Sequence, residues 1–127
     1  MSQEYKVKDV MLKNPVTVRE DETVFDAVKK MAELNIGAIP VVNKEGRVVG
    51  IFSERDLLKR VVVRELSYET KIKEVMTKDP VTVSPEASVE EAKEVMAKIK
   101  ARHLPVIDEN SQLVGVVSLS DIDLSVY

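Results

Sequence analysis

The sequence repeats itself at a spacing of 65 residues, and this repeat limits the possible folds more than any other feature. The clearest matches are Val10-Met11 with Val75-Met76, Pro15–Val18 with Pro80–Val83, Pro40-Val41 with Pro105-Val106, Val49-Gly50 with Val114-Gly115, and Ser53 and Asp56 with Ser118 and Asp121. Residues 7–62 align with 72–127 without a gap, and about a third of the positions are identical. The chain is therefore a tandem duplication, with a first repeat at 7–64, a polar linker at 65–71 and a second repeat at 72–127.

Each repeat predicts the element order β-α-β-β-α. A short strand is expected at 16–18 and again at 81–83, since both follow a Pro and are rich in Val and Thr. Helix-start boxes follow at Thr23-x-x-Asp26 and Ser88-x-x-Glu91. The apolar residues spaced for one buried helix face are Val24, Ala27, Val28, Met31 and Leu34 in the first copy, and Val89, Ala92, Met96 and Ile99 in the second.

Two apolar runs in each repeat predict a β-hairpin, at 39–42 and 48–52 in the first copy and at 104–107 and 113–117 in the second. Asn110 is the expected left-handed residue of the second turn. A last helix is expected to start near Ser53 and near Ser118. The fold class is therefore α+β. Because about 56 residues are marginal as a lone domain, the two copies are expected to pack about a pseudo-twofold axis into one compact module. Such packing creates two related clefts, where small ligands usually bind.

Composition excludes several classes of protein. The chain has 127 residues, of which 44% are hydrophobic, so a real core is expected. Its apolar runs are far shorter than the roughly twenty residues of a transmembrane helix, and no signal peptide is visible. No Cys and a single His leave neither thiolate chemistry nor a metal site to expect. A net charge of −3 without an aromatic basic patch makes nucleic acid an unlikely partner. The finely mixed charges fit a cytoplasmic and thermophilic protein.

The segment Gly50–Asp56, repeated as Gly115–Asp121, is the sharpest local motif. In each copy an apolar strand ends in Ser, and Asp follows three residues later. Ordinary helix capping explains this pattern about as well as ligand binding does. A short Asp is expected to reach the capped amide less easily than Glu, which leaves its oxygens free for a ligand. A Ser and a carboxylate at a strand's end suit the diol of a ribose.

The two copies resemble a tandem pair of CBS domains, the arrangement called a Bateman module. The motifs that carry the resemblance are Val10-Met11 with Pro15–Val18, Gly37–Val42 with Gly46, and Gly50–Asp56, then Val75-Met76, Arg102–Ile107 and Gly115–Asp121. They span nearly the whole chain, so an attached catalytic domain is not expected. The resemblance implies a regulatory module that senses an adenine nucleotide (AMP, ADP or ATP) for a separate, unidentified partner protein.

The resemblance also implies site residues. The ribose-binding residues are Ser53, Asp56, Ser118 and Asp121; the base-binding residues are Thr17, Val18, Gly37, Ala38, Ile39, Thr82, Val83 and Leu104; the phosphate-binding residues are Arg102, His103 and Arg55. Catalytic residues, cofactors and metal ligands are not expected. In the family's crossed arrangement, residues 102–104 serve the cleft of Ser53 and Asp56, and residues 37–39 serve the cleft of Ser118 and Asp121.

The copies differ where phosphate would bind. Arg102-His103 replaces Gly37-Ala38, and Arg55 corresponds to Ser120. Because Arg donates two aligned hydrogen bonds to phosphate oxygens, the cleft of Ser53 and Asp56 is expected to bind phosphorylated nucleotides best. A solvated Arg and a structural His are the plain alternatives.

Two other functions stay open at this point. One is a sensor of S-adenosylmethionine, and the other is an adaptor for protein or nucleic acid that works without a nucleotide. An enzyme is not expected, since neither Ser53 nor Ser118 has a His at a repeated spacing to activate it. Five apolar residues between 57 and 63 exceed what one buried helix face needs, which is typical of a subunit interface. The resemblance to CBS domain pairs implies that this interface forms a homodimer.

Overall fold

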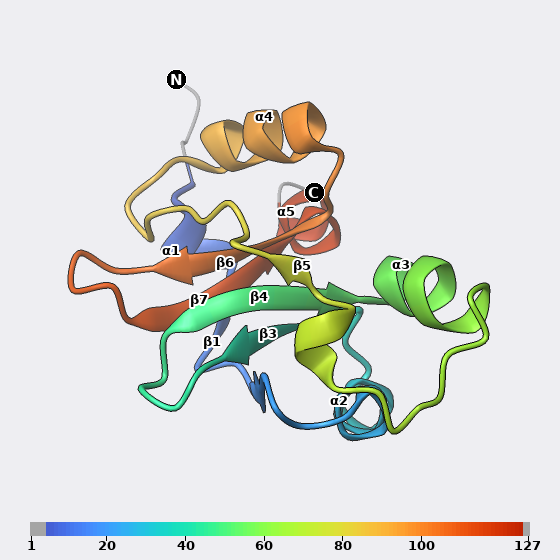
Figure 1. Cartoon of the computed structure of the whole chain (residues 1–127). Helices are drawn as coiled ribbons and strands as arrows, with labels where there is room; N and C mark the ends of the chain where they lie inside the picture. Colours follow the sequence, from blue (N-terminus) through green and yellow to red (C-terminus); the bar gives the residue numbers. More distant parts are fainter. Residues whose placement is uncertain (1–4, 126–127) are drawn as a thin grey trace. The chain divides into compact units, whose positions relative to one another are not determined.

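The computed structural model describes residues 5–125 of the chain (Figure 1). Its contacts divide the chain into two compact units. One unit consists of residues 16–80, and the other combines residues up to Pro15 with those from Val81 onward. The sequence repeats and the compact units are thus different divisions of the chain, because the segment before each repeated strand packs with the other copy.

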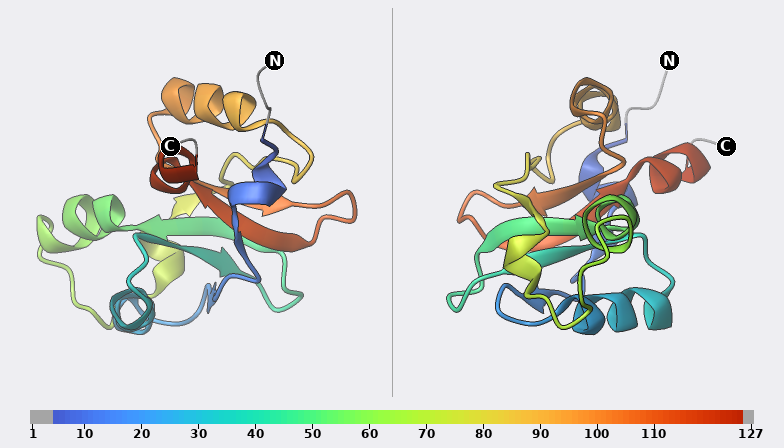
Figure 2. Two further views of the ribbon diagram at one scale, coloured as in Figure 1. Left: turned by 180° about the vertical axis from the view of Figure 1, so that it is seen from behind. Right: turned by 45° about the vertical axis from the view of Figure 1, so that its right-hand side comes forward.

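The unit of residues 16–80 is built on a four-stranded sheet of order β2-β3-β4-β5. Its elements are β2 (Val18–Arg19), α2 (Val24–Leu34), β3 (Ala38–Val42), β4 (Val48–Ser53), α3 (Glu54–Asp56), the π-helical turn η1 (Leu57–Val62), the short 3-10 helix η2 (Ile72–Glu74) and β5 (Thr77–Lys78). β2 runs parallel to β3, and the other pairs are antiparallel. Helix α2 lies along one face of this sheet (Figure 2), where its buried residues meet Ile39 and Phe52 in the core.

The other unit has a three-stranded sheet of order β1-β7-β6. Its elements are α1 (Val7–Val10), β1 (Leu12–Lys13), α4 (Val89–Ile99), β6 (His103–Ile107), β7 (Leu113–Ser118) and α5 (Leu119–Ser125). The expected strand at 81–83 is reduced to a single parallel bridge between Val83 and Val106. The core combines α4 and the two long strands with Val7, which comes from the far end of the sequence and is fully buried.

The predicted helices and hairpins are confirmed. Thr23 and Ser88 cap α2 and α4, whose buried residues follow the predicted helical spacing. The last predicted apolar residue of each helix is the exception, because Leu34 and Ile99 are 49% and 41% exposed. Each lies in the last turn, directly before a residue with left-handed backbone at which the helix ends.

The second hairpin turn differs from its prediction. Ser111, and not Asn110, has the left-handed backbone, with a φ of 62°. Ser111 occupies the position of Gly46, whose φ is 80°. The Asp108 carboxylate determines this geometry, because its Oδ1 accepts hydrogen bonds from the amides of Asn110 and Gln112, as Asn43 does in the first hairpin.

Glycine is required where the two swapped segments join their sheets. Gly50 of β4 lies opposite Lys78 of β5, and the side chain of Met76 fills the space where a Cβ would stand. Gly115 has the same relation to Met11. Met76 is buried and Met11 partly buried, as expected for residues that fill core gaps. Among the described residues, no helix is long and apolar enough to cross a membrane.

Candidate functional site

The end of β4 forms a corner at which Ser53 turns the chain into α3. Ser53 lies opposite Ala38 of β3, and the amide of Glu54 donates to the carbonyl of Gly37 at 3.0 Å. The Ser53 hydroxyl accepts a hydrogen bond from the Asp56 amide at 3.2 Å. The structure therefore brings Ser53 and Asp56 together with residues 37–38 of the same copy.

The carboxylate of Asp56 is 7% exposed and fully engaged within its own unit. Its Oδ2 accepts from the Ser53 amide at 3.0 Å and from the Ser53 hydroxyl at 3.1 Å. The Thr77 hydroxyl donates to Oδ1 at 3.2 Å, and Nε of Arg60 lies 3.4 Å from the same oxygen. The expectation that a short Asp leaves its oxygens free is wrong for Asp56, because its side chain closes the capping box with Ser53.

The matching corner in the other unit lies at the end of β7. Ser118 pairs with His103, and the amide of Leu119 donates to the carbonyl of Arg102 at 2.9 Å. The Ser118 hydroxyl accepts from the Asp121 amide at 3.0 Å. Asp121 itself is exposed, and among the described residues no hydrogen bond or ion pair reaches its carboxylate. Asp121 is therefore available to a ligand in a way that Asp56 is not.

Two cationic side chains, those of Arg55 and Arg102, are exposed, and His103 is half-buried. Each Ser corner has basic residues close to it within its own unit. Arg55 lies two residues after Ser53 in the chain, whereas Arg102 and His103 lie beside Ser118 through the pairing of β6 with β7. The crossed arrangement combines groups of both units and stays a prediction.

Four of the eight predicted base-binding residues are buried. Val18 and Ile39 are fully buried, and Leu104 and Ala38 are 1% and 4% exposed. Such positions can offer a ligand their backbone groups but little side-chain surface. Thr17, Gly37 and Val83 are half-buried and Thr82 is exposed, so these four have surface to offer.

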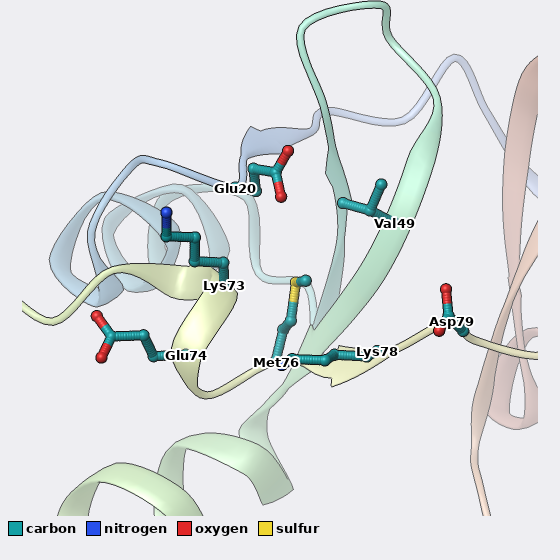
Figure 3. Close-up of a pocket in the computed structure, with 7 residues that line it drawn as sticks. All are labelled: Glu20, Val49, Lys73, Glu74, Met76, Lys78 and Asp79. Carbon is teal, nitrogen blue, oxygen red and sulfur yellow. The ribbon is translucent and has the colours of Figure 1, made fainter.

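A surface pocket of about 430 Å³ lies beside β5 in the unit of residues 16–80 (Figure 3). Its lining residues are Glu20, Val49, Lys73, Glu74, Met76, Lys78 and Asp79. None of the predicted site residues belongs to this group. The pocket mixes three acidic with two basic side chains around Val49 and Met76, so it shows no charge preference for a nucleotide. The described residues contain no group of three or more His, Asp or Glu side chains arranged to hold a metal ion.

Sequence reasoning missed Thr77 and Arg60, the two residues that reach Asp56 from other elements. Neither is part of a repeated motif, because the positions equivalent to them are Leu12 and Ser125. Their departure from the repeat is the signal that could have found them, since Thr77 is polar where Leu12 is apolar and Arg60 is charged where Ser125 is neutral.

Comparison with known proteins assigns this chain to a protein family. A family model described as "CBS domain" matches residues 7–63 and again 72–125. An uncharacterized protein of Bacillus subtilis (strain 168), YlbB, is 39% identical over 121 residues, which cover 94% of this chain and 81% of YlbB. An inosine-5'-monophosphate dehydrogenase of Methanocaldococcus jannaschii is 36% identical over 118 residues, which cover 92% of this chain but 23% of that enzyme.

The solved structures agree with this placement. The CBS domain pair of protein MJ0100, in complex with 5'-methylthioadenosine and S-adenosyl-L-methionine, matches with a TM-score of 0.89 and 27% identity. The match covers 98% of this chain and 97% of that chain. The predicted fold of two strand-helix-strand repeats is therefore confirmed, both by the elements and by the neighbours that share them.

Proposed function

This chain belongs to the CBS domain family, and on that premise we propose that it is a regulatory module that binds an adenine nucleotide and reports it to a separate partner protein. The observation that carries the proposal is the corner built twice in the same register: Ala38 faces Ser53, His103 faces Ser118, and an Asp follows each Ser by three residues. The dehydrogenase relative is similar to this chain over 23% of its own length, so the similarity does not extend to the rest of that enzyme.

Each corner has the chemistry for a ribose. A carboxylate accepts two hydrogen bonds from adjacent hydroxyls, and a Ser hydroxyl beside it both donates and accepts. In the proposal, Ser53 with Asp56 and Ser118 with Asp121 hold ribose hydroxyls. The half-buried Gly37 and the exposed Thr82 contact the base. Arg55, Arg102 and His103 hold the phosphates of AMP, ADP or ATP.

The crossed arrangement predicts which Asp shares a binding site with Arg102, and this prediction can be measured separately. If Arg102 serves the cleft of Asp56, the double variant Arg102→Ala/Asp56→Ala loses less nucleotide affinity than the two single losses combined. If Arg102 instead serves its neighbour in the same unit, that non-additivity appears with Asp121→Ala. Calorimetric titration of the single and double variants distinguishes the two.

S-adenosylmethionine is a second candidate ligand. The observation in its favour is the MJ0100 pair, which holds that molecule and 5'-methylthioadenosine. S-adenosylmethionine carries an adenosine with the same ribose diol but no phosphate, so it would depend on Ser and Asp and not on the Arg residues. Replacement of Arg102 by Ala therefore weakens ATP binding and leaves S-adenosylmethionine binding unchanged in this proposal.

Sensing works through differential binding in this proposal. A ligand that contacts groups of both copies stabilises the arrangement in which both supply those contacts, and the partner protein distinguishes that arrangement from the others. We also propose a homodimer, since Leu58, Val62 and Val63 of the η1 region are 58%, 44% and 75% exposed. Leu58→Glu is expected to turn the dimer into a monomer in light scattering.

A thermal-shift panel tests the function. The panel contains AMP, ADP, ATP, S-adenosylmethionine, NAD and a short DNA duplex. A specific ligand at 100 times its Kd adds about 2.7 kcal/mol of stability. Asp121→Ala is expected to reduce the shift. Asp26→Ala is the matched control, because Asp26 closes a capping box with Thr23 at α2 and is not among the site residues. A salt-sensitive shift with the duplex alone would replace the proposal with a nucleic-acid adaptor.

A further inference from the structure

The acceptor positions of Asp56 are occupied before any ligand arrives. A carboxylate offers about four lone-pair positions. Here the Ser53 amide and hydroxyl take Oδ2, while the Thr77 hydroxyl and Arg60 Nε reach Oδ1 at 3.2 and 3.4 Å. A ribose diol needs two acceptor positions on this buried group, so it has to displace two internal donors.

The two partners from outside the Ser53 corner, a hydrogen bond from Thr77 and an ion pair with Arg60, are the replaceable ones. Ser53 is fixed to Asp56 by the capping box, whereas Thr77 lies on β5 and Arg60 on η1. Arg60 is also tied to β5, since its Nη1 donates to the carbonyl of Met76 at 2.9 Å. Asp56 thus joins the end of β4, the η1 turn and β5 in one network.

The other unit has the equivalent strand pairing but different residues at the Thr77 and Arg60 positions. β1 pairs with β7 in the register in which β5 pairs with β4: Leu12 faces Val116 as Thr77 faces Ile51. The residue at the Thr77 position is therefore Leu12, and the residue at the Arg60 position is Ser125. Asp121 is exposed and has no such network among the described residues.

We propose that Thr77 and Arg60 form a latch on Asp56, so that a nucleotide ribose engages Asp121 first and engages Asp56 only when the latch opens. This inference rests on the proposed function. It reverses the order expected from the basic residues alone, which favoured the cleft of Asp56. The latch makes Thr77 the residue that determines which of two otherwise similar corners binds a ribose more tightly.

Opening the latch has a consequence for the connection between the units. Thr77 and Met76 belong to the segment that ends at Pro80, where the chain leaves this unit. A ribose at Asp56 removes the contact of Thr77 to Asp56, while the two β4 pairs, the hydrogen bond from the Asp79 amide to the Val49 carbonyl and the buried Met76 still hold that segment. Ribose binding at Asp56 is therefore coupled to the number of contacts that hold β5 in this unit.

Calorimetric titration with AMP tests the latch. Asp121→Ala serves as the parent, because it leaves Asp56 as the remaining ribose acceptor. In this parent, Thr77→Val removes the hydroxyl at nearly constant volume, and AMP is expected to bind about three- to tenfold more tightly, the gain from one displaced hydrogen bond. Thr77→Ser keeps the hydroxyl and is expected to bind AMP as the parent does.

A matched control uses the equivalent position of the other unit. In an Asp56→Ala parent, Leu12→Val changes the same register position without a hydroxyl, and AMP affinity is expected to stay unchanged. An unchanged or weaker affinity in Thr77→Val, or an equal gain in Leu12→Val, would overturn the latch while the sensing function stands. Absence of AMP binding by the wild type and by every variant would overturn the function together with the latch.

Discussion

Three segments share the pattern Ser/Thr-x-x-Asp, at 23–26, 53–56 and 118–121, but their surroundings in the structure differ. At Thr23 and Asp26 the carboxylate closes a capping box at the surface. At Ser53 the Asp closes the same box and is also held by a hydrogen bond from Thr77 and an ion pair with Arg60, which come from other elements. Asp121 is exposed, with no partner for its carboxylate among the described residues. The pattern predicts a helix start in each case, whereas the role of the carboxylate depends on residues distant in sequence.

Asp26 makes stability depend on pH in a defined direction. The hydrogen bond from the Thr23 backbone lowers the pKa of Asp26 below its ordinary value of 3.8, with further help from the Thr23 hydroxyl and from Lys30 and Lys29. A lowered folded-state pKa means that the contribution is complete above the ordinary value and is lost as pH falls through the folded value. Asp26→Ala is expected to cost about 1 kcal/mol at pH 7 and progressively less below about pH 4.

Urea unfolding between neutral and acid pH measures this difference. Glu91→Ala is the control, since Glu91 occupies the same position on α4 but its carboxylate does not close a box with Ser88. The control is expected to show a small difference that does not shrink in acid. A constant cost of Asp26→Ala at all pH values would contradict the assignment.

The elements divide into those that local sequence specifies and those that it does not. α2 and α4 are long, capped and amphipathic, so their pattern predicts them well. β1 and β5 have two residues each and exist because a strand distant in sequence pairs with them. No local sequence pattern predicts strands as short as these. The hairpins lie between these cases, because their strands are evident but the turn residue is not.

The two hairpin turns offer a reciprocal substitution. Gly46 adopts a φ of 80° with open space around it, and Ser111 adopts a φ of 62° at the matching position. Gly adopts positive φ without a steric penalty because it has no Cβ, whereas Ser adopts it at an energetic cost. Ser111→Gly is therefore expected to raise the free energy of unfolding by about 0.5–1 kcal/mol, and Gly46→Ser to lower it by a similar amount.

Denaturant midpoints of the two variants measure the effect. Asn110→Gly serves as the control next to the turn residue, because Asn110 does not adopt positive φ. Stabilisation by Asn110→Gly but not by Ser111→Gly would show that the turn has the geometry expected from sequence and not the one described.

The whole molecule is organised by exchange of the segments with which each repeat begins. Val7, at the start of the first repeat, is fully buried with residues of the second, while Ile72 occupies the matching place in the unit of residues 16–80. Both residues lie 65 positions apart and play the same part in opposite units. The linker predicted at 65–71 is ordered: the amides of Val24 and Phe25 donate to the carbonyls of Thr70 and Tyr68.

This exchange predicts which fragment of the chain folds. A fragment of residues 16–80 contains both strands of its hairpin, α2 and the core residues Ile72, Val75 and Met76. A fragment of residues 7–64 lacks these three and exposes Val7, whose partners are in the other unit. Circular dichroism and amide dispersion in NMR spectra are expected to show more structure in the fragment 16–80. Equal order in both fragments would contradict the division.

The sequence by itself determined the duplication, the order of the long elements, the caps and the family resemblance, because these depend on local patterns and on a repeat that can be counted. Only the tertiary structure decided which Asp is engaged and which is exposed, since Thr77 and Arg60 reach Asp56 from 21 and 4 residues away along different elements. It also decided which segment completes which sheet. Pairing and burial between distant residues depend on three-dimensional packing, and no pattern within a single repeat encodes them.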